Sequence, residues 1–130
     1  MLAAESRSGQ LRPQNNRIEG MCLHALDAWV SDASVLTDAE RLRATLYLGA
    51  EAGGAHVVGE EFHVFPNGAV TGVLVLAQSH LSIHTWPEFA LANIDLLSYG
   101  DLRGADVLRT ICDELKVERA RVSCIPRAIA

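Results

Sequence analysis

Residues 78–88 of the chain, QSHLSIHTWPE, concentrate side chains that can attack a carbonyl group, carry protons or stack on a flat ligand. Ser79 is a candidate nucleophile, His80 and His84 are candidate acids or bases, and Trp86 offers a large aromatic surface. They directly follow the apolar run 73–77, VLVLA, which is typical of a buried strand. An ordinary strand would use its solvent-facing positions for solubility, so this segment is the first candidate for a functional site.

The two histidines have the spacing of a helical zinc-binding pair, H-x-x-x-H, but their neighbours predict a strand. Ile83, Thr85 and Trp86 favour a strand, and Pro87 would end a helix. Residues four apart on a strand are separated by roughly 13 Å, which is too far for two ligands of one ion. No nearby set of carboxylates and histidines compensates for this separation, so we expect no metal site in the protein.

The alternation of a strand divides the segment into two faces. Leu81 and Ile83 should pack beneath helices, while His80, Ser82, His84 and Trp86 should share the opposite face. A polar and aromatic face is unusual in water, so it is an enzyme site, a surface that packs on a second sheet, or both. The alternative is a structural histidine beside a surface tryptophan, which is the usual role of such residues taken singly.

The surrounding chain predicts the elements that position this segment. Thr37 and Glu40 fit a capping box that opens a helix running to Gly53-Gly54, with Leu42 and Leu46 on its buried face. A second helix is indicated by the spacing of apolar residues in 108–115. Strands are expected at 18–30, 56–65, 69–77, 81–86, 89–98 and 117–125, with a Pro-Asn-Gly turn at 66–68. This order predicts an α+β fold, a two-layer sandwich with helices on one face of an antiparallel sheet.

Length and composition limit the possible functions. The 130 residues suit a single domain at 18–130, preceded by a polar, flexible tail at 1–17, and 49% of them are apolar. The formal charge of −5 includes no basic stripe, which argues against a nucleic-acid partner. Cys22, Cys112 and Cys124 form no CxxC motif, and no run is long enough for a membrane span. We expect a reduced, cytoplasmic protein that is not bound to a membrane.

Residues 68–100, GAVTGVLVLAQSHLSIHTWPEFALANIDLLSYG, resemble the core of the prokaryotic, pyruvoyl-dependent S-adenosylmethionine decarboxylase proenzymes. The typical pattern of that family is a glycine-rich turn, an apolar strand, an ESH-x-(S/T)-IHTWPE run and a strand ending in Cys-Gly. The order of elements fits the family across about residues 20–127, and the SHxSIHTWPE core is highly specific.

The resemblance implies that the protein makes its own cofactor. The Ser79 hydroxyl would attack the carbonyl of Gln78, and β-elimination of the resulting ester would release residues 1–78. A pyruvoyl group made from Ser79 would then begin the chain 79–130. His84 and Thr71 match the histidine and hydroxyl residue that assist this step; Thr71 replaces the usual serine, and Gln78 replaces the usual glutamate.

The resemblance also implies a substrate, and the uncovered face of the sheet separately predicts an assembly. The pyruvoyl ketone would form a Schiff base with the amine of S-adenosylmethionine, and decarboxylation would supply the aminopropyl donor for spermidine. Phe65 and Trp86 would hold the adenine between them, and Glu88 would accept hydrogen bonds from the ribose hydroxyls. Without the family resemblance, structural roles are the alternatives to substrate binding. Phe65 and Trp86 would then pack in the core, and Glu88 would be a solvated carboxylate in a turn. A homodimer that stacks two sheets in an αββα arrangement would cover the His84 face.

One departure from the pattern affects the chemistry. Tyr99 stands before Gly100, where the family has the cysteine that returns a proton to the substrate carbon. The three cysteines of this chain lie elsewhere and are expected to be buried spectators. Two alternatives to the leading hypothesis therefore stay open: a pyruvoyl-dependent decarboxylase of a smaller amino acid, such as ornithine or arginine, and a homologue without catalytic activity.

The residues present favour the leading hypothesis over both alternatives. A smaller amino acid has no adenosine to hold, so the presence of Phe65, Trp86 and Glu88 favours S-adenosylmethionine as the substrate. Ser79, His84 and Thr71 are all present, and this disfavours a homologue that has lost catalysis.

Overall fold

The computed structural model describes residues 4–6 and 20–128 of the chain, and these form one sheet with two helices. The helices are α1, Ala39–Ala52, and α2, Gly104–Leu115, with short 3₁₀ helices η1, Ala33–Thr37, and η2, Pro87–Phe89. The strands are β1, Ala4–Ser6; β2, Met21–Val30; β3, Val57–Val64; β4, Val70–Leu76; β5, His80–Trp86; β6, Leu91–Tyr99; and β7, Val117–Arg127.

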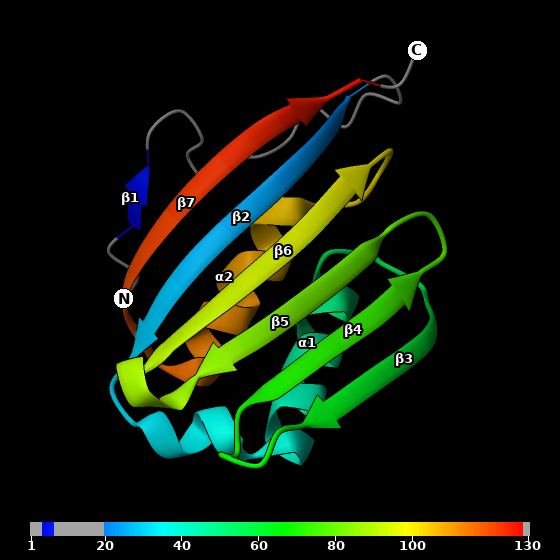
Figure 1. Cartoon of the computed structure of the whole chain (residues 1–130). Helices are drawn as coiled ribbons and strands as arrows, with labels where there is room; N and C mark the ends of the chain where they lie inside the picture. Colours follow the sequence, from blue (N-terminus) through cyan, green and yellow to red (C-terminus); the bar gives the residue numbers. More distant parts are fainter. Residues whose placement is uncertain (1–3, 7–19, 129–130) are drawn as a thin grey trace.

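The strands form one sheet in the order β1-β7-β2-β6-β5-β4-β3, and α1 and α2 lie side by side against the same face of it (Figure 1). All neighbouring pairs are antiparallel except β1 with β7. The predicted α+β fold with helices on one face is therefore confirmed. The short strand β1 lies within the segment 1–17, for which a loose tail was expected; residues 7–19 lie outside the described part of the chain.

The core forms between the helices and the alternate strand residues that face them. The residues 0–1% exposed include Leu42 and Leu46 on α1, Leu81 and Ile83 on β5, and Ile111 on α2, all within one apolar cluster. The predicted buried faces of α1 and β5 are thereby confirmed. In the described part of the chain, the opposite face of the central strands carries no helix, as Figure 1 shows, and this open face holds His84 and Trp86.

The start of α1 differs from the prediction. Thr37 ends η1, where its hydroxyl donates to the Ser34 carbonyl at 3.2 Å, and the N-cap of α1 is Asp38, whose carboxylate accepts from the Arg41 N–H at 3.1 Å. The capping box with Glu40 is therefore wrong. Both residues can cap a helix, and the preceding 3₁₀ turn moves the cap position one residue along the chain.

The remaining boundaries follow the predictions within a few residues. Strand β2 begins at Met21, and the predicted start at Ile18 lies outside the described residues. The helix η2, at the Pro87 position, separates β5 from β6, and Ala90 follows it with a positive φ of 51°. Within the described ranges, no helix is both long enough and apolar enough to span a membrane.

Candidate active site

A cavity of about 450 Å³ opens where three loops meet at one end of the sheet. The turn between β4 and β5 contributes Gln78 and Ser79, the end of β6 contributes Tyr99, and the loop after α1 contributes His56. Ser79 is half-buried, while Gln78 is exposed. The predicted cleavage site and the residue that departs from the family pattern therefore share one cavity.

The β4–β5 turn is tight and regular. The Leu76 N–H donates to the Ser79 carbonyl at 2.9 Å, and the Ser79 N–H donates to the Leu76 carbonyl at 3.3 Å. The Gln78–Ser79 peptide bond thus sits at a surface hairpin turn, beside the cavity. This position leaves room for a covalent rearrangement without moving the paired strands.

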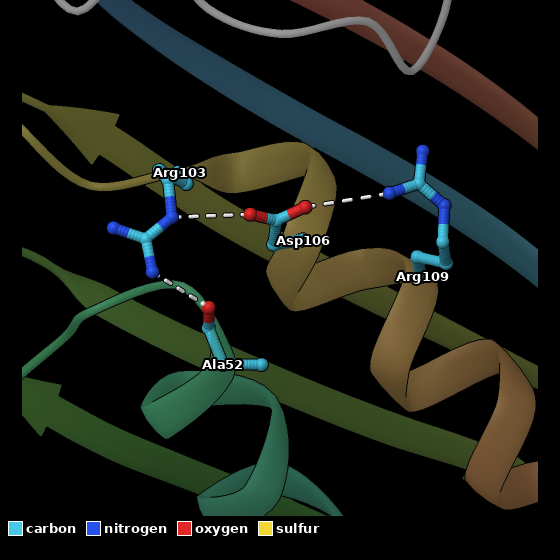
Figure 2. Close-up of polar contacts among 4 residues, drawn as sticks. All are labelled: Ala52, Arg103, Asp106 and Arg109. Carbon is cyan, nitrogen blue, oxygen red and sulfur yellow. Dashed lines mark hydrogen bonds and ion pairs between the residues drawn. The ribbon is translucent and has the colours of Figure 1, made fainter.

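The opposite wall of the cavity is fixed by contacts between the two helices. Figure 2 shows the Arg103 side chain donating to the Ala52 carbonyl at 2.9 Å and to the Asp106 carboxylate at 3.1 Å. Asp106 also accepts from Arg109 at 3.3 Å, and the Arg103 N–H donates to the Gly53 carbonyl at 3.0 Å. These bonds join the end of α1 to the start of α2, so the loops that carry Gly54 and Leu102 into the cavity wall are held together.

A second group of predicted residues lies on the open face. Thr71 on β4 stands directly opposite His84 on β5, with 2.6 Å between the Thr71 Oγ1 and the His84 Nδ1. The next residue in this row is Asn93 on β6, which pairs with His84 and whose amide donates to Asp27 on β2 at 2.8 Å. Four neighbouring strands therefore contribute to one polar row.

Aromatic rings flank His84 on this face. Its ring centroid lies 4.5 Å from that of Trp86 and 5.8 Å from that of Phe65, both in edge-on geometry. Trp86 also donates from its indole N–H to the Asn93 side-chain oxygen at 2.6 Å, which fixes the plane of the indole. Phe65 and Trp86 remain 37% and 38% exposed, so both rings can still contact a ligand. Glu88 is exposed on η2, immediately after β5.

The two groups are well separated within one chain. Ser79 precedes β5, whereas His84 is five residues further along, which corresponds to about 16 Å on a strand. The structure therefore brings Gln78, Ser79 and Tyr99 together, and it brings Thr71, His84, Phe65 and Trp86 together. It does not bring Ser79 to the Thr71–His84 pair.

A family model described as S-adenosylmethionine decarboxylase matches residues 23–128, which span the helices, the open face and the cavity. The chain belongs to the S-adenosylmethionine decarboxylase family. An S-adenosylmethionine decarboxylase proenzyme of Methanococcus maripaludis is 35% identical over 105 residues, covering 80% of this chain and 86% of the relative. The family resemblance stated from residues 68–100 is thereby confirmed.

The share of the relative's length that this chain matches differs among family members. The proenzyme of Pseudomonas aeruginosa strain LESB58 is 33% identical over 93 residues, or 71% of this chain, and the match spans only 58% of the relative. The crystal structure of the adenosylmethionine decarboxylase from Aquifex aeolicus VF5 is 30% identical, with a TM-score of 0.77 over 86% of this chain and 94% of that one. The chain therefore covers nearly all of the Aquifex fold and little more than half of the Pseudomonas relatives.

Two groups of residues were not predicted from the sequence. Asn93 and Asp27 extend the polar row and orient Trp86, and only the strand register reveals them. On the helix-facing side, Cys22, His24 and Cys124 converge, although the cysteines were expected to be spectators. Burial lowers the pKa of His24, and burial followed by the nearby Cys124 thiol raises the pKa of Cys22 to about 11. The C-x-H spacing at 22–24, which puts both side chains on one face of a strand, was the available signal.

Proposed function

We propose that the protein is a self-processing, pyruvoyl-dependent decarboxylase of S-adenosylmethionine. The observation that carries this proposal is the position of Ser79, at a hairpin turn that lines the same cavity as Tyr99. Membership of the family supports it, and the relatives in Methanococcus and Pseudomonas are named proenzymes. The product, decarboxylated S-adenosylmethionine, would supply the aminopropyl group for spermidine.

Processing begins at the Gln78–Ser79 peptide bond. The Ser79 hydroxyl attacks the Gln78 carbonyl carbon, the C–N bond breaks, and the acyl group moves from nitrogen to oxygen as an ester. A base then removes the Ser79 Cα proton while the Cβ–O bond breaks. This releases residues 1–78 with a carboxylate on Gln78, and hydrolysis of the remaining dehydroalanine gives the pyruvoyl group and ammonia.

The residues present fit this group. Five register pairs, from Thr71–His84 to Val75–His80, hold β4 and β5 together on the sheet side of the turn. Cleavage at the turn therefore leaves the two chains paired, and residue 79 becomes an N-terminus beside the cavity. When present, the pyruvoyl group supplies a ketone that accepts electron density as carbon dioxide leaves.

The separation of Ser79 from Thr71 and His84 supports a site built from two protomers. One register row of the open face holds four apolar residues, with His80 between the first two: Val75, Leu97, Leu23 and Ile125. Val75 and Ile125 are each 46% exposed, so this surface carries a mostly apolar band. Stacked sheets pack about 10 Å apart, with their inner side chains interdigitating. A homodimer formed through the open faces would bury this band.

The symmetry of such a dimer would bring Ser79 of one protomer close to Thr71 and His84 of the other. A two-fold axis that lies between the sheets, perpendicular to β5 and near Ser82, reverses the strand direction of the second protomer. His84 of one protomer then lies over the His80 end of the other, next to Ser79. Thr71 and His84 would thus assist the processing of the opposite chain.

Substrate binding follows from the same arrangement. Phe65 and Trp86 offer exposed aromatic faces to the adenine, and the Asn93 hydrogen bond holds the indole in place for it. Glu88 is exposed at the end of β5, where its carboxylate can accept from both ribose hydroxyls. The His84 ring lies near both of these rings, close to where the reacting end of the substrate would be.

One observation favours a second candidate function. Tyr99 lines the cavity beside Ser79 and occupies volume that a cysteine would leave open. A smaller amino acid, such as ornithine or arginine, would suit a reduced cavity. Of the two candidate substrates, S-adenosylmethionine is favoured over a smaller amino acid, because Phe65 and Trp86 offer aromatic surfaces suited to adenosine.

Intact-mass measurement followed by a decarboxylation assay tests the proposal. Purified protein should contain two chains, residues 1–78 and 79–130, with the second blocked to Edman degradation and reactive with a carbonyl reagent. Carboxyl-labelled S-adenosylmethionine should release labelled carbon dioxide, with ornithine and arginine as competing substrates. Ser79→Ala should remain one chain, and Ser31→Ala, at an exposed site after β2, is the matched control. A wild-type chain that stays intact at 14.0 kDa after long incubation would refute the proposal.

A further inference from the structure

Three metal-binding side chains converge beneath the start of α2, on the face of the sheet opposite the Thr71–His84 pair. The Cys22 Sγ, a His24 ring nitrogen and the Cys124 Sγ all lie within 4.8 Å of one another. His24 is 1% exposed, and both cysteines are half-buried. The cluster is therefore largely shielded from solvent, and its two cysteines keep part of their surface exposed.

The strand register explains why these residues meet. His24 on β2 stands directly opposite Cys124 on β7, and Cys22 precedes His24 by two residues, so it points to the same face. The Cys124 Sγ lies 3.3 Å from the His24 Nδ1. Sulfur and nitrogen ligands of one tetrahedral Zn²⁺ lie about 3.6 Å apart, given Zn–S and Zn–N bonds of about 2.3 and 2.0–2.1 Å. The Cys124–His24 spacing therefore already approaches that of a metal site, and all three ligand atoms lie within 4.8 Å of one another.

The hydrogen bonds around His24 are compatible with the tautomer that a metal requires. The Ser98 hydroxyl donates to the Cys22 carbonyl at 3.3 Å, so the Ser98 oxygen is available to accept from the His24 Nε2, 3.0 Å away. With the proton on Nε2, the Nδ1 lone pair is directed toward Cys124. Outer-shell partners of this kind orient the histidine ligands of metal sites.

A disulfide fits the arrangement less well than an ion. Cys22 stands opposite Pro126 rather than Cys124, so the two cysteines are diagonal neighbours. Diagonal residues on antiparallel strands have Cα atoms about 7–8 Å apart, and disulfides rarely exceed about 6.8 Å. A cation that bridges two sulfur atoms needs no such approach.

We propose that Cys22, His24 and Cys124 bind one thiophilic cation, Zn²⁺, with a solvent molecule in the fourth position. Two thiolates and one imidazole are the ligands that zinc prefers, and three protein ligands leave one position open. The bound ion would fasten β2 to β7, and through Ser98 it would also support β6 just before Tyr99. The site is independent of the proposed decarboxylase activity, because its residues face the opposite side of the sheet.

Cobalt substitution tests this site without any activity assay. Full-length protein, reduced with a phosphine and freed of metal with a chelator, is titrated with Co²⁺ and then with Zn²⁺. One Co²⁺ per chain should bind with a thiolate-to-cobalt charge-transfer band, and stoichiometric Zn²⁺ should remove that band and raise the Tm. No charge-transfer band, or a band that Zn²⁺ does not displace, overturns the proposal.

Variants assign the ligands. Cys22→Ser and Cys124→Ser should each lose the band, whereas Cys112→Ser, a matched change at the cysteine outside the cluster, should keep it. Ser98→Ala retains all three ligands and should weaken Zn²⁺ binding by about 10- to 100-fold. Equal Zn²⁺ affinity in Cys22→Ser, Cys124→Ser and wild type would overturn the proposal, as would formation of a Cys22–Cys124 disulfide in place of metal uptake. Circular dichroism confirms that each variant is folded.

Discussion

Thr71 and His84 stand directly opposite each other on β4 and β5, and their side chains share a hydrogen bond of 2.6 Å between the Oγ1 and the Nδ1. The bond engages the Nδ1 of His84, whose ring centroid lies 5.8 Å from that of Phe65 and 4.5 Å from that of Trp86. A short-chain hydroxyl residue at position 71 therefore orients the imidazole. Either threonine or serine can do so, which explains why the departure from the family's usual serine is tolerable.

The first prediction concerns this hydroxyl. Thr71→Val preserves the shape of the side chain but removes the hydrogen bond to His84, and it should slow self-cleavage. Positioned acid–base groups typically contribute about 10²- to 10⁴-fold, so the effect should fall within that range. Thr71→Ser should cleave at close to the wild-type rate. Time courses of intact mass provide the measurement, and equal rates for the valine and serine variants would contradict the role.

The second prediction concerns the two-protomer site. Ser79→Ala and His84→Ala chains should each remain intact when expressed alone. In co-expressed protein, a mixed dimer places the intact His84 of the first chain beside the intact Ser79 of the second. Only the His84→Ala chain should then be cleaved, and its fragment is recognisable because its mass carries the substitution. Cleavage that never appears in the mixture, or a monomer by sedimentation at micromolar concentration, would contradict the arrangement.

Local patterns predicted the elements well, because each depends on neighbours along the chain. The alternation in β5 located the faces of His84 and Leu81, and the apolar spacing in α2 located its helix. The cap of α1 failed for a local reason, since Thr37 and Asp38 can both serve and the preceding 3₁₀ turn decides between them. The spacing of residues in the sequence did not show whether Thr37 or Asp38 is the N-cap of α1.

The site was harder to predict, because register and distant pairing build it. The predicted strand at 81–86 already separates Ser79 from His84, but sequence alone could not show that Thr71 stands opposite His84 or that Tyr99 lines the cavity beside Ser79. Equally, His24 and Cys124 are 100 residues apart, and only the pairing of β2 with β7 makes them neighbours. The family resemblance pointed to a set of candidate residues without showing which of them one protomer brings together.

The third prediction concerns the buried hydroxyl of Thr85 on β5, which is hydrogen-bonded to β4 and to η1. Thr85 is 0% exposed; its Oγ1 accepts from the Val70 N–H and donates to the Leu36 carbonyl, each at 2.8 Å. Thr85→Val leaves both backbone groups unpaired in the core, which should cost about 1–3 kcal/mol for each. Urea unfolding measures this loss. Thr110→Val makes the same change at a half-buried threonine on α2 and is the control; it should change the free energy of unfolding by less than about 0.5 kcal/mol.

The fourth prediction is a pH dependence at the α1–β3 contact. Hydrogen bonds from Arg43 and then Tyr47 lower the pKa of Glu60 below its ordinary value of 4.5. The unfolded chain therefore binds this proton more readily than the folded one. The stabilisation is complete above pH 4.5 and is lost as the pH falls from there through the folded pKa.

Glu60→Gln should flatten the fall of the Tm below about pH 5, while leaving a small loss of stability at neutral pH. Glu61→Gln changes the neighbouring exposed carboxylate on β3 and is the matched control. Thermal unfolding between about pH 6 and pH 3 gives the comparison. If Glu60→Gln and Glu61→Gln follow the same pH profile, the Arg43–Glu60 contact contributes nothing measurable.

The last prediction concerns Tyr99, which lines the cavity beside Ser79 where the family pattern has a cysteine. Return of a proton to the substrate carbon requires a nearby acid, and a phenol, ordinarily near pKa 10, is a weaker donor than a thiol near 8.5. Turnover of S-adenosylmethionine should therefore be slow. A proton delivered to the wrong carbon, followed by hydrolysis, would leave the substrate's amino group on residue 79 as alanine and release the decarboxylated substrate as an aldehyde. The 79–130 fragment should therefore convert to an alanine-started chain as the enzyme loses activity.

Tyr99→Cys should raise the rate of carbon dioxide release and extend the lifetime of the processed enzyme, by at most the roughly 10²- to 10⁴-fold expected of a general acid. Tyr99→Phe keeps the ring and removes the hydroxyl, so it should be slower than wild type if Tyr99 donates the proton. Neighbouring Ser98 is not an alternative donor, because its buried hydroxyl contacts His24 on the opposite side of the sheet. Should Tyr99→Cys show no activity toward S-adenosylmethionine while the wild type decarboxylates ornithine or arginine, the smaller substrate is the correct one. A cleaved protein that releases carbon dioxide from none of the three would be a homologue that retains processing and has lost catalysis.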